Sequence, residues 1–449
     1  MALVAPRQGY TGLRGLQTLV SSIGTSRSFT SFPVYTRRKS PVVGNFVVST
    51  SRRPNDVHLA ISIRIGVRYN SSVVSKKSAL PPDQQLSYDR LRPIVDDFEA
   101  PMDWAVAYGS GVMKQAQVKP GDPPSLTDLL LSTSSPVEFH TINLRQNPSH
   151  YPLHARLMGP GGIAHVQENR GAGVWYVTDV KVNGISVKYG IISTSTLIQD
   201  LNEWRTFYLS GRLHKPTLPL ILPNSTSELK GEGEAAEEGE RLIKALENNL
   251  ISALSLALIL CPEEFEEDYL WEKIAGLSYS GDPRMSIPGG ENPEKVKNIV
   301  KGPGARDGFR SMYGAYLNEK GVSWVNGEKE VYVNGQNWIG DGDGLLRQPF
   351  TPEHQLALSN SLPLSLRQKV STHLNNQDQI SFNEKTQDLT IKNIQDPKFR
   401  SILSTELRNI IHKPALRQSI KGLYTAGFTK SFWYALAKIR KWFKGRGNK

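Results

Sequence analysis

The stretch "WAVAYGSGV" at residues 104–112, followed by "SLTDLLLS" at residues 125–132, contains the pattern that decides the fold. Both are short apolar runs next to turn residues, which is typical of buried β-strands. The triplet "GSG" at 109–111 ends the first run, and one carboxylate, Asp128, interrupts the second. A plain turn would explain the glycines. A bound phosphate would also explain them, because a turn without Cβ atoms exposes backbone N–H groups to an anion.

A lone carboxylate inside an apolar strand is costly to bury, so Asp128 should have a cation as its partner. Nucleotidyltransferases of the DNA-polymerase-beta type combine a Gly-Ser turn after one strand with carboxylates on the next strand, which hold Mg²⁺ against a triphosphate. Their strands often carry two carboxylates on one face, whereas this sequence has Leu130 at the second position. A second metal ligand must therefore come from elsewhere, and Asp200 and Asp282 are the candidates.

Residues 173–194 predict a β-hairpin whose turn is "NG". Its second strand carries Lys188, and contact with a triphosphate would explain a lysine at that position. Four large side chains then recur at helical spacing behind a Ser/Thr cap: Leu197, Leu201, Trp204 and Tyr208. The sequence therefore predicts a mixed α/β domain over residues 86–222.

An acidic, low-complexity stretch follows at residues 223–240 and predicts a solvated linker or surface insertion. Residues 241–415 are predicted to be mostly helical, starting with a helical segment over 241–278. The longest apolar run, Leu250 to Leu260, has eleven residues. That is shorter than the roughly 20 residues that a membrane-spanning helix needs.

Two groups of potential ligands have simple structural explanations. The polar stretch "HTINLRQNPSHY" at residues 140–151 fits no zinc motif, so polar contacts or core hydrogen bonds are expected there. The single cysteine, Cys261, excludes a disulfide framework and a cysteine metal cluster. It ends an apolar run and is expected to be buried.

The net charge of +12 is concentrated at the two ends of the chain. Residues 1–82 hold twelve Lys/Arg and one acid, whereas residues 430–449 hold seven basic residues and no acid. The part between them therefore carries a net charge of −6, and no nucleic-acid partner is expected. The N-terminal segment, rich in Arg and Ser without a long apolar run, predicts a mitochondrial transit peptide. A disordered basic tail is the alternative.

The C-terminal segment, residues 416–449, predicts a basic amphipathic helix that lies in the plane of a membrane. Its apolar arc and aromatic edges are Phe432, Trp433, Leu436, Ile439, Trp442 and Phe443. A helix packed on the body of the protein is the alternative, but such a helix usually has acids as well as cations on its outer face.

Eight motifs in chain order resemble the mitochondrial translocator assembly and maintenance family: "YGSGV", "HTINLRQNPSHY", "GAGVWY", "KYGIIST", "YLSGRLHKP", "IAGLSYSGDPRM", "KVKNIVK" and "RQSIKGLYTAGFTKS". Its members are the peripheral mitochondrial CDP-diacylglycerol synthases, or phosphatidate cytidylyltransferases. The resemblance implies an α+β fold with a polymerase-beta-like nucleotidyltransferase domain, a mostly helical, winged-helix-like second domain and a C-terminal membrane helix. The absence of a second carboxylate after Asp128 is shared by the family pattern.

The resemblance also implies an activity and a location. The enzyme would make CDP-diacylglycerol from CTP and phosphatidic acid for cardiolipin synthesis, on the matrix side of the inner mitochondrial membrane, with Mg²⁺ or another divalent cation. The residues expected to act in catalysis are Ser110, Asp128 and Lys188. Those expected to bind the phosphates are Gly109, Ser110, Gly111, Lys188 and Arg284. Asp128 and Asp282 are the expected metal ligands, and Arg417 and Lys421 are expected at the lipid headgroup.

Two other functions fit parts of the sequence. A nucleotidyltransferase with a soluble or RNA acceptor would have no use for the C-terminal helix, and the acidic body of the protein disfavours RNA. A non-enzymatic assembly factor of the inner membrane would leave the Gly-Ser-Gly turn and Asp128 unexplained.

Overall fold

The computed structural model describes residues 82–109, 112, 126–223, 233–285, 294–326, 344–375 and 388–426. All of them belong to one compact unit of the chain, Asp56–Lys449. Most of the predicted transit peptide lies outside the described residues, and so does the predicted membrane helix with its six apolar and aromatic side chains. Ser110 and Gly111 also lie outside them.

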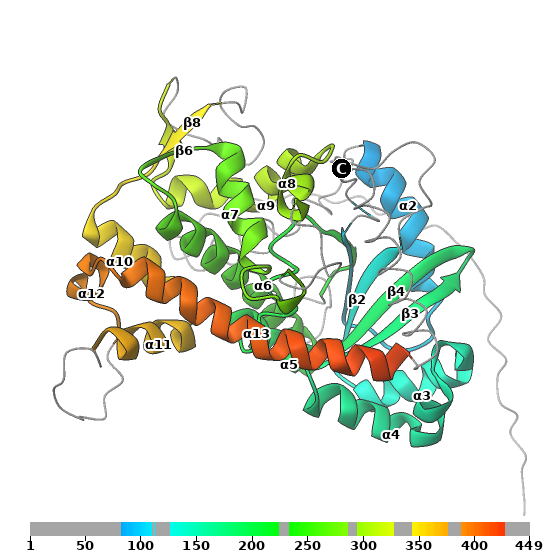
Figure 1. The fold of residues 1–449 in the computed structure, drawn as a ribbon. Helices are drawn as coiled ribbons and strands as arrows, with labels where there is room; N and C mark the ends of the chain where they lie inside the picture. Colours follow the sequence, from blue (N-terminus) through cyan, green and yellow to red (C-terminus); the bar gives the residue numbers. More distant parts are fainter. Residues whose placement is uncertain are drawn as a thin grey trace, which may run out of the picture. The chain divides into compact units, whose positions relative to one another are not determined.

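A five-stranded mixed sheet holds the predicted strands (Figure 1). Its spatial order is β3 (Val174–Val182), β4 (Ile185–Ser193), β2 (Thr127–Thr133), β1 (Trp104–Tyr108) and β5 (Leu218–Ile221). Neighbouring strands are antiparallel except β2 and β4, which are parallel. The four predicted strands and the mixed α+β class are confirmed, whereas β5, an edge strand that contains a proline, had no clear signal.

The β3–β4 hairpin shows why its turn has the sequence "NG". Asn183 and Gly184 have φ angles of 49° and 78°, a conformation that Asn and Gly tolerate better than other residues. The register then pairs Val182 with Ile185 across the turn.

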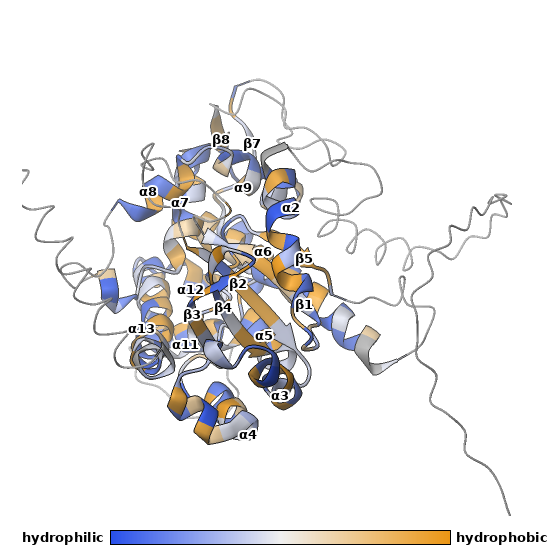
Figure 2. Ribbon diagram, turned by 90° about the vertical axis from the view of Figure 1, so that its right-hand side faces the viewer, coloured by the Kyte–Doolittle hydropathy of each residue, from blue (hydrophilic) through white to orange (hydrophobic). Residues whose placement is uncertain are grey.

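Helices cover both faces of this sheet. On one face lie α2 (Pro82–Asp96), α3 (Pro136–Gln146), the short η2 (Pro148–His150) and α4 (Leu153–Asn169). On the other lie α5 (Thr194–Glu203) and the first part of α6 (Glu234–Leu260). Apolar residues are concentrated on the strands and on the helix sides that meet them (Figure 2).

The helix after the hairpin is shorter than predicted. The Ser193 hydroxyl caps α5 by accepting a hydrogen bond from the Thr196 amide, as expected from the Ser/Thr signal. The helix ends at Trp204, whose backbone is left-handed, so Tyr208 lies outside it. The cause is Asp200, whose carboxylate accepts backbone N–H bonds from four residues of the next turn: Thr206, Phe207, Leu209 and Ser210. Asp200 therefore organises this turn, and its carboxylate is not open as a metal ligand.

The rest of the described chain is mostly helical, as predicted. It contains α7 (Glu267–Leu277), the short η3 (Pro283–Met285), α8 (Lys295–Val300), α9 (Ala305–Glu319), α10 (Pro352–Asn360), α11 (Leu364–Asn375), α12 (Ile391–Gln395) and α13 (Phe399–Ala426). A small sheet accompanies them, in the order β6 (Glu264–Glu266), β8 (Leu345–Arg347) and β7 (Ser323–Trp324). These helices enclose an apolar core that includes the buried Cys261.

The helical segment predicted over 241–278 differs in two details. It begins earlier, at Glu234, within the stretch predicted to be a linker, and it breaks at Cys261, before β6. A proline at position 262 cannot continue the α6 hydrogen-bond ladder, which explains the break.

Among the described residues, α6 is the helix long and apolar enough to cross a bilayer by length and composition. However, 72% of its most apolar window is buried inside the protein. Such burial is typical of a core helix, so its composition alone is weak support for a membrane span.

Helix α13 runs from the helical core to the edge of the large sheet (Figure 1). The Gln418 side chain accepts a hydrogen bond from the Ala172 amide at 2.9 Å. The buried Lys421 ammonium donates to the carbonyls of Gln167 at 3.0 Å and Arg170 at 2.8 Å. Lys421 therefore fastens α13 to the end of α4, which differs from the headgroup contact expected for it, whereas Arg417 is exposed.

The polar stretch at 140–151 forms a buried hydrogen-bond network, which confirms its structural interpretation. His140 contacts the Tyr151 hydroxyl through Nδ1 at 2.8 Å and Gln167 Oε1 through Nε2 at 2.9 Å. Because an amide oxygen only accepts, Nε2 carries the proton of the neutral ring. Asn143 donates to the hydroxyls of Tyr151 and Tyr189, so the network joins α3 and α4 to the sheet.

We expect His140→Ala to lower the free energy of unfolding by about 2–4 kcal/mol, because it creates a cavity and leaves buried polar atoms without a partner. Burial lowers the pKa of His140 to about 4. The unfolded chain therefore binds a proton that the native state does not, and the stability carried by the neutral ring falls as the pH drops from about 6.5 towards 4. Urea unfolding at pH 7 and pH 5 measures both effects.

His165→Ala, at an exposed position of α4, is the matched control and should change little. Equal losses of stability in the two variants would contradict the network's role.

Candidate active site

Three side chains form a row across the large sheet, on the face covered by α5. The strand register places Tyr108 of β1 and Lys188 of β4 on either side of Asp128 of β2. The Lys188 ammonium donates to Asp128 Oδ1 at 3.0 Å, and about a quarter of each side chain is exposed (28% and 25%). Asp128 thus has the cation partner that its burial requires, supplied by a residue that the sequence had singled out separately.

Tyr176 of β3 supports the lysine from the side. The Lys188 ammonium lies 4.5 Å from the centre of the Tyr176 ring, a cation–π contact. A Cβ on Gly190 would come within 2.7 Å of that ring, so the glycine makes room for it. Burial opposes the charged ammonium, but the attraction of Asp128 and Tyr176 outweighs it and raises the pKa of Lys188.

The first glycine of the Gly-Ser-Gly turn lies against this row. Gly109 follows β1 with a φ of 75°, and its carbonyl accepts a hydrogen bond from the Val112 amide at 3.1 Å. A Cβ there would lie 3.3 Å from Asp128 Oδ2. The turn therefore begins beside the carboxylate, and a side chain at position 109 would be strained and crowded.

Arg212 is the second cation of the site, in the loop between α5 and β5. Its guanidinium stacks on the Tyr208 ring at 3.7 Å and donates to the Tyr208 carbonyl. It also interacts electrostatically with Lys188 and with the phenols of Tyr108 and Tyr176. Burial raises the pKa of both phenols, which therefore stay neutral near physiological pH.

Lys215 extends the cluster towards the helical region. Its ammonium donates to the Gly211 carbonyl at 2.6 Å and to the Ser278 hydroxyl at 2.9 Å. Lys215 and Lys295 lie 5.4 Å and 5.6 Å from the Tyr279 ring. Burial, together with repulsion from Arg212 and Lys295, lowers the pKa of Lys215 to about 7. Such accumulated positive charge is favourable for a bound polyanion.

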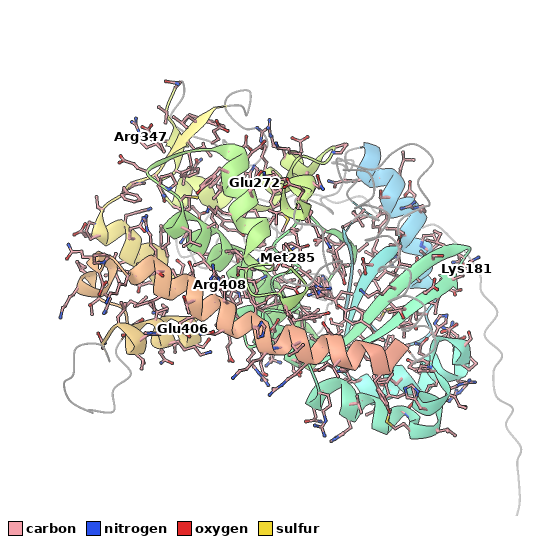
Figure 3. The ribbon with its side chains drawn as sticks, in the orientation of Figure 1. Lys181, Glu272, Met285, Arg347, Glu406 and Arg408 are labelled. Carbon is pink, nitrogen blue, oxygen red and sulfur yellow. The ribbon has the colours of Figure 1, made fainter. Side chains whose placement is uncertain are left out.

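Asp282 and Arg284 form an ion pair at the same cluster. The Arg284 guanidinium donates to both carboxylate oxygens, at 2.5 to 3.1 Å, and the Arg284 amide donates to Oδ1. Burial opposes ionisation of Asp282, but these bonds and the arginine charge lower its pKa. Arg212 also acts on both residues. The preceding Gly281 packs against the backbone of Arg408 in α13, close to Met285 (Figure 3).

The arrangement separates the two expected metal ligands, Asp128 and Asp282. Asp128 keeps Oδ2 turned towards the Gly109 turn, whereas the Asp282 carboxylate is occupied by Arg284. Within the described ranges, no three His, Cys, Asp or Glu side chains gather as a metal cluster. Mg²⁺ commonly binds one or two carboxylates together with substrate phosphates and water, so a single carboxylate beside a cationic cluster fits that mode.

Sequence reasoning had singled out Asp128, Lys188, Asp282 and Arg284 individually, and electrostatic interactions through Arg212 join them. The tyrosines were missed. For Tyr108 and Tyr176 the sequence did hold a signal. The alternation of side chains along a strand places both of them on the sheet face that carries Asp128 and Lys188. Tyr208 was assigned to a helix instead.

Comparison with known proteins identifies the family. A family model described as "Phosphatidate cytidylyltransferase, mitochondrial" matches residues 91–441. Curated proteins of that name are similar over most of the chain. The one from Xenopus laevis is 36% identical over 353 residues, which is 78% of this chain and 94% of the relative. The one from Mus musculus is 36% identical over 355 residues, which is 79% of this chain and 95% of the relative. The one from Schizosaccharomyces pombe is 36% identical over 363 residues, which is 81% of this chain and 85% of the relative.

We expect the site to take up a proton when it binds inorganic triphosphate. A polyanion raises the pKa of Lys215 from about 7, so a lysine that is largely neutral at pH 8 becomes charged. Titration calorimetry in buffers with different ionisation enthalpies measures this uptake as a buffer-dependent binding enthalpy.

Lys215→Gln should abolish the buffer dependence. Lys273→Gln should keep it, because Lys273 also lies over a tyrosine ring, Tyr269, but outside the cluster. A wild-type enthalpy that is the same in all buffers would contradict the expectation.

Proposed function

Because the chain belongs to the family of mitochondrial phosphatidate cytidylyltransferases, we propose that it transfers CMP from CTP to phosphatidic acid, giving CDP-diacylglycerol and pyrophosphate. The observation that supports this activity in the structure is the cluster around Asp128. One carboxylate lies beside a glycine turn and close to Lys188, with further cations grouped around Arg212. That arrangement suits a nucleoside triphosphate with a divalent cation.

The reaction needs positioning more than a strong base. A phosphomonoester such as phosphatidic acid has a second pKa of about 6, so it is largely a dianion near neutral pH. One of its oxygens attacks the α-phosphorus of CTP, and a new P–O bond forms. The bond from the α-phosphorus to the bridging oxygen breaks, and pyrophosphate leaves with the electron pair. The enzyme has to align the two phosphates and neutralise their charge.

We assign roles to the side chains accordingly. Gly109, Ser110 and Gly111 bind the β- and γ-phosphates through their N–H groups and the hydroxyl. Asp128 would hold Mg²⁺, which when bound neutralises the triphosphate. Lys188 and Arg212 face the same phosphates.

Asp282 has a different role from the one first expected. Because both of its oxygens are bonded to Arg284, we assign it to positioning that guanidinium for phosphate contact, and not to the metal. The cations Lys215 and Lys295 complete the positive environment of the leaving pyrophosphate.

The fold supports the same proposal. A glycine turn after β1 and a carboxylate on the neighbouring β2 favour a polymerase-beta-like nucleotidyltransferase domain over 86–222. The helices and the small sheet that follow, over 241–415, are the part for which we propose a winged-helix-like arrangement. The boundaries of these domains stay predictions.

We further propose where the enzyme works. Residues 1–82 are a transit peptide, and residues 430–449 attach the enzyme to the matrix side of the inner membrane as a peripheral protein. Its product then feeds cardiolipin synthesis. The acidic body of the chain disfavours nucleic acid as a partner.

Asp128→Asn is expected to lower CDP-diacylglycerol formation by at least about a thousandfold, because a neutral amide is a poor Mg²⁺ ligand. The assay uses radiolabelled CTP, Mg²⁺ and phosphatidic acid in liposomes, with the lipid product extracted and counted. The variant should stay folded under the assay conditions, because the amide oxygen still accepts from Lys188, but it should unfold at a lower urea concentration, because the ammonium loses its charged partner.

Asp179→Asn is the matched control. Asp179 is exposed on β3 of the same sheet with a φ of 54°, which asparagine tolerates, so activity should be unchanged. Wild-type turnover by the Asp128 variant would remove the carboxylate from the mechanism.

Deleting residues 430–449 should weaken binding to anionic liposomes while CTP binding persists, because the deleted segment carries seven cations and no acid. Liposome flotation and nucleotide titration measure the two properties separately. Equal flotation of the truncated and full-length chains would contradict the proposed attachment.

A further inference from the structure

Helix α4 and the last turns of α13 expose large apolar side chains. On α4, Leu153 and Leu157 are 63% and 80% exposed, and on α13, Leu416 and Ile420 are 45% and 61% exposed. The spacing is four residues in each helix, so each pair forms a stripe along one face. Exposed leucines and isoleucines that group in this way usually mark an interaction surface.

The two helices contact each other through residues that are close in sequence to both stripes. The rings of His154 on α4 and Tyr424 on α13 have their centres 4.3 Å apart. The Tyr424 hydroxyl also contacts the Met158 sulfur at 3.8 Å. Leu153 and Leu157 directly precede His154 and Met158, and Ile420 lies one turn before Tyr424. We call Leu153, Leu157, Leu416 and Ile420 the α4–α13 apolar surface.

The charge around this surface is positive. Arg156 of α4 and Lys413 and Arg417 of α13 are exposed. Glu406 is the last acid of the chain, and eleven Lys/Arg follow it. In α4 the one acid is Glu168, near the end of the helix. Exposed apolar side chains bordered by cations are the combination that binds an anionic lipid bilayer.

We propose that the α4–α13 apolar surface is a second membrane contact, which lies on an anionic bilayer and adds to the attachment proposed for residues 430–449. The inference rests on the proposed function, because that activity places the acceptor in a bilayer. Two other groups that could cover this apolar surface are disfavoured by their charge. The chain's own segment 430–449 is strongly basic, and a second copy of the chain would bring the same cations face to face.

The contact would orient the active site. Gln418 and Lys421 fasten α13 to α4 and to the start of β3. That strand belongs to the same sheet as Asp128 and Lys188. A bilayer in contact with α4 and α13 therefore holds the sheet at a defined angle to the membrane.

The test uses the full chain with both Leu157→Ser and Ile420→Ser. Flotation with vesicles of phosphatidylcholine, alone or with cardiolipin, measures binding. Removing two large apolar side chains should weaken partition into the anionic vesicles by at least about tenfold. Leu86→Ser with Leu364→Ser is the matched control, because these side chains are 69% and 53% exposed on α2 and α11. The control should bind like the wild type.

Turnover separates this surface from the active site. The double variant should lose activity on phosphatidic acid in vesicles but keep wild-type activity on a short-chain, water-soluble phosphatidic acid. A wild type inactive on both substrates would overturn the proposed function, whereas flotation would still test the surface.

Three results would overturn the membrane contact. One is unchanged partition of the double variant into anionic vesicles. Another is a change from dimer to monomer in light scattering with partition unchanged, which would assign the surface to a second copy. The third is an effect of the substitutions that disappears once residues 430–449 are deleted, which would assign the surface to that segment.

Discussion

The parallel pairing of β2 with β4 is the constraint on which the site depends. Parallel neighbours place equivalent positions side by side on one face, and the register here puts Asp128 next to Lys188. Tyr108, on the antiparallel β1, completes the row. A shift of one residue in either pairing would turn the carboxylate or the ammonium to the opposite face, among the side chains of α2, α3 and α4. Leucines lie on both faces of β2, so they do not distinguish the two registers. The cost of burying the charge of Asp128 or Lys188 among apolar side chains disfavours the shifted one.

Much of this could be predicted from the sequence, where the signal was local. The four strands, the Asn-Gly hairpin and the buried polar network followed from alternation, turn residues and the absence of a zinc pattern. The end of α5 did not follow, because a tertiary contact of the Asp200 carboxylate stops the helix that the spacing of Trp204 and Tyr208 favoured. Likewise, nothing local shows that Lys421 is buried, since its acceptors lie more than 250 residues earlier in the chain.

The site could be predicted as separate residues but not as an arrangement. Asp128 and Lys188 each stood out as a charge within a strand, which is an exception to a strong local rule. The bond between Asp282 and Arg284 was hidden, because an aspartate near an arginine in a turn fits a metal ligand and an ion pair equally well. The two are distinguished by the Arg284 guanidinium, which donates to both oxygens of Asp282. Arg212 then links this turn to the sheet, because its charge acts on both Lys188 and Asp282.

Helix α13 has a consequence for how the protein unfolds. Its first half packs in the helical core, through residues such as Leu403 and Ile411, and its second half is fastened to the large sheet by Gln418 and Lys421. One continuous helix therefore belongs to both hydrophobic cores, and neither core can open without breaking contacts of the other. The two should melt in a single cooperative transition. A ligand that binds at the sheet should then raise the melting temperature of the whole unit, including helices that do not contact the ligand.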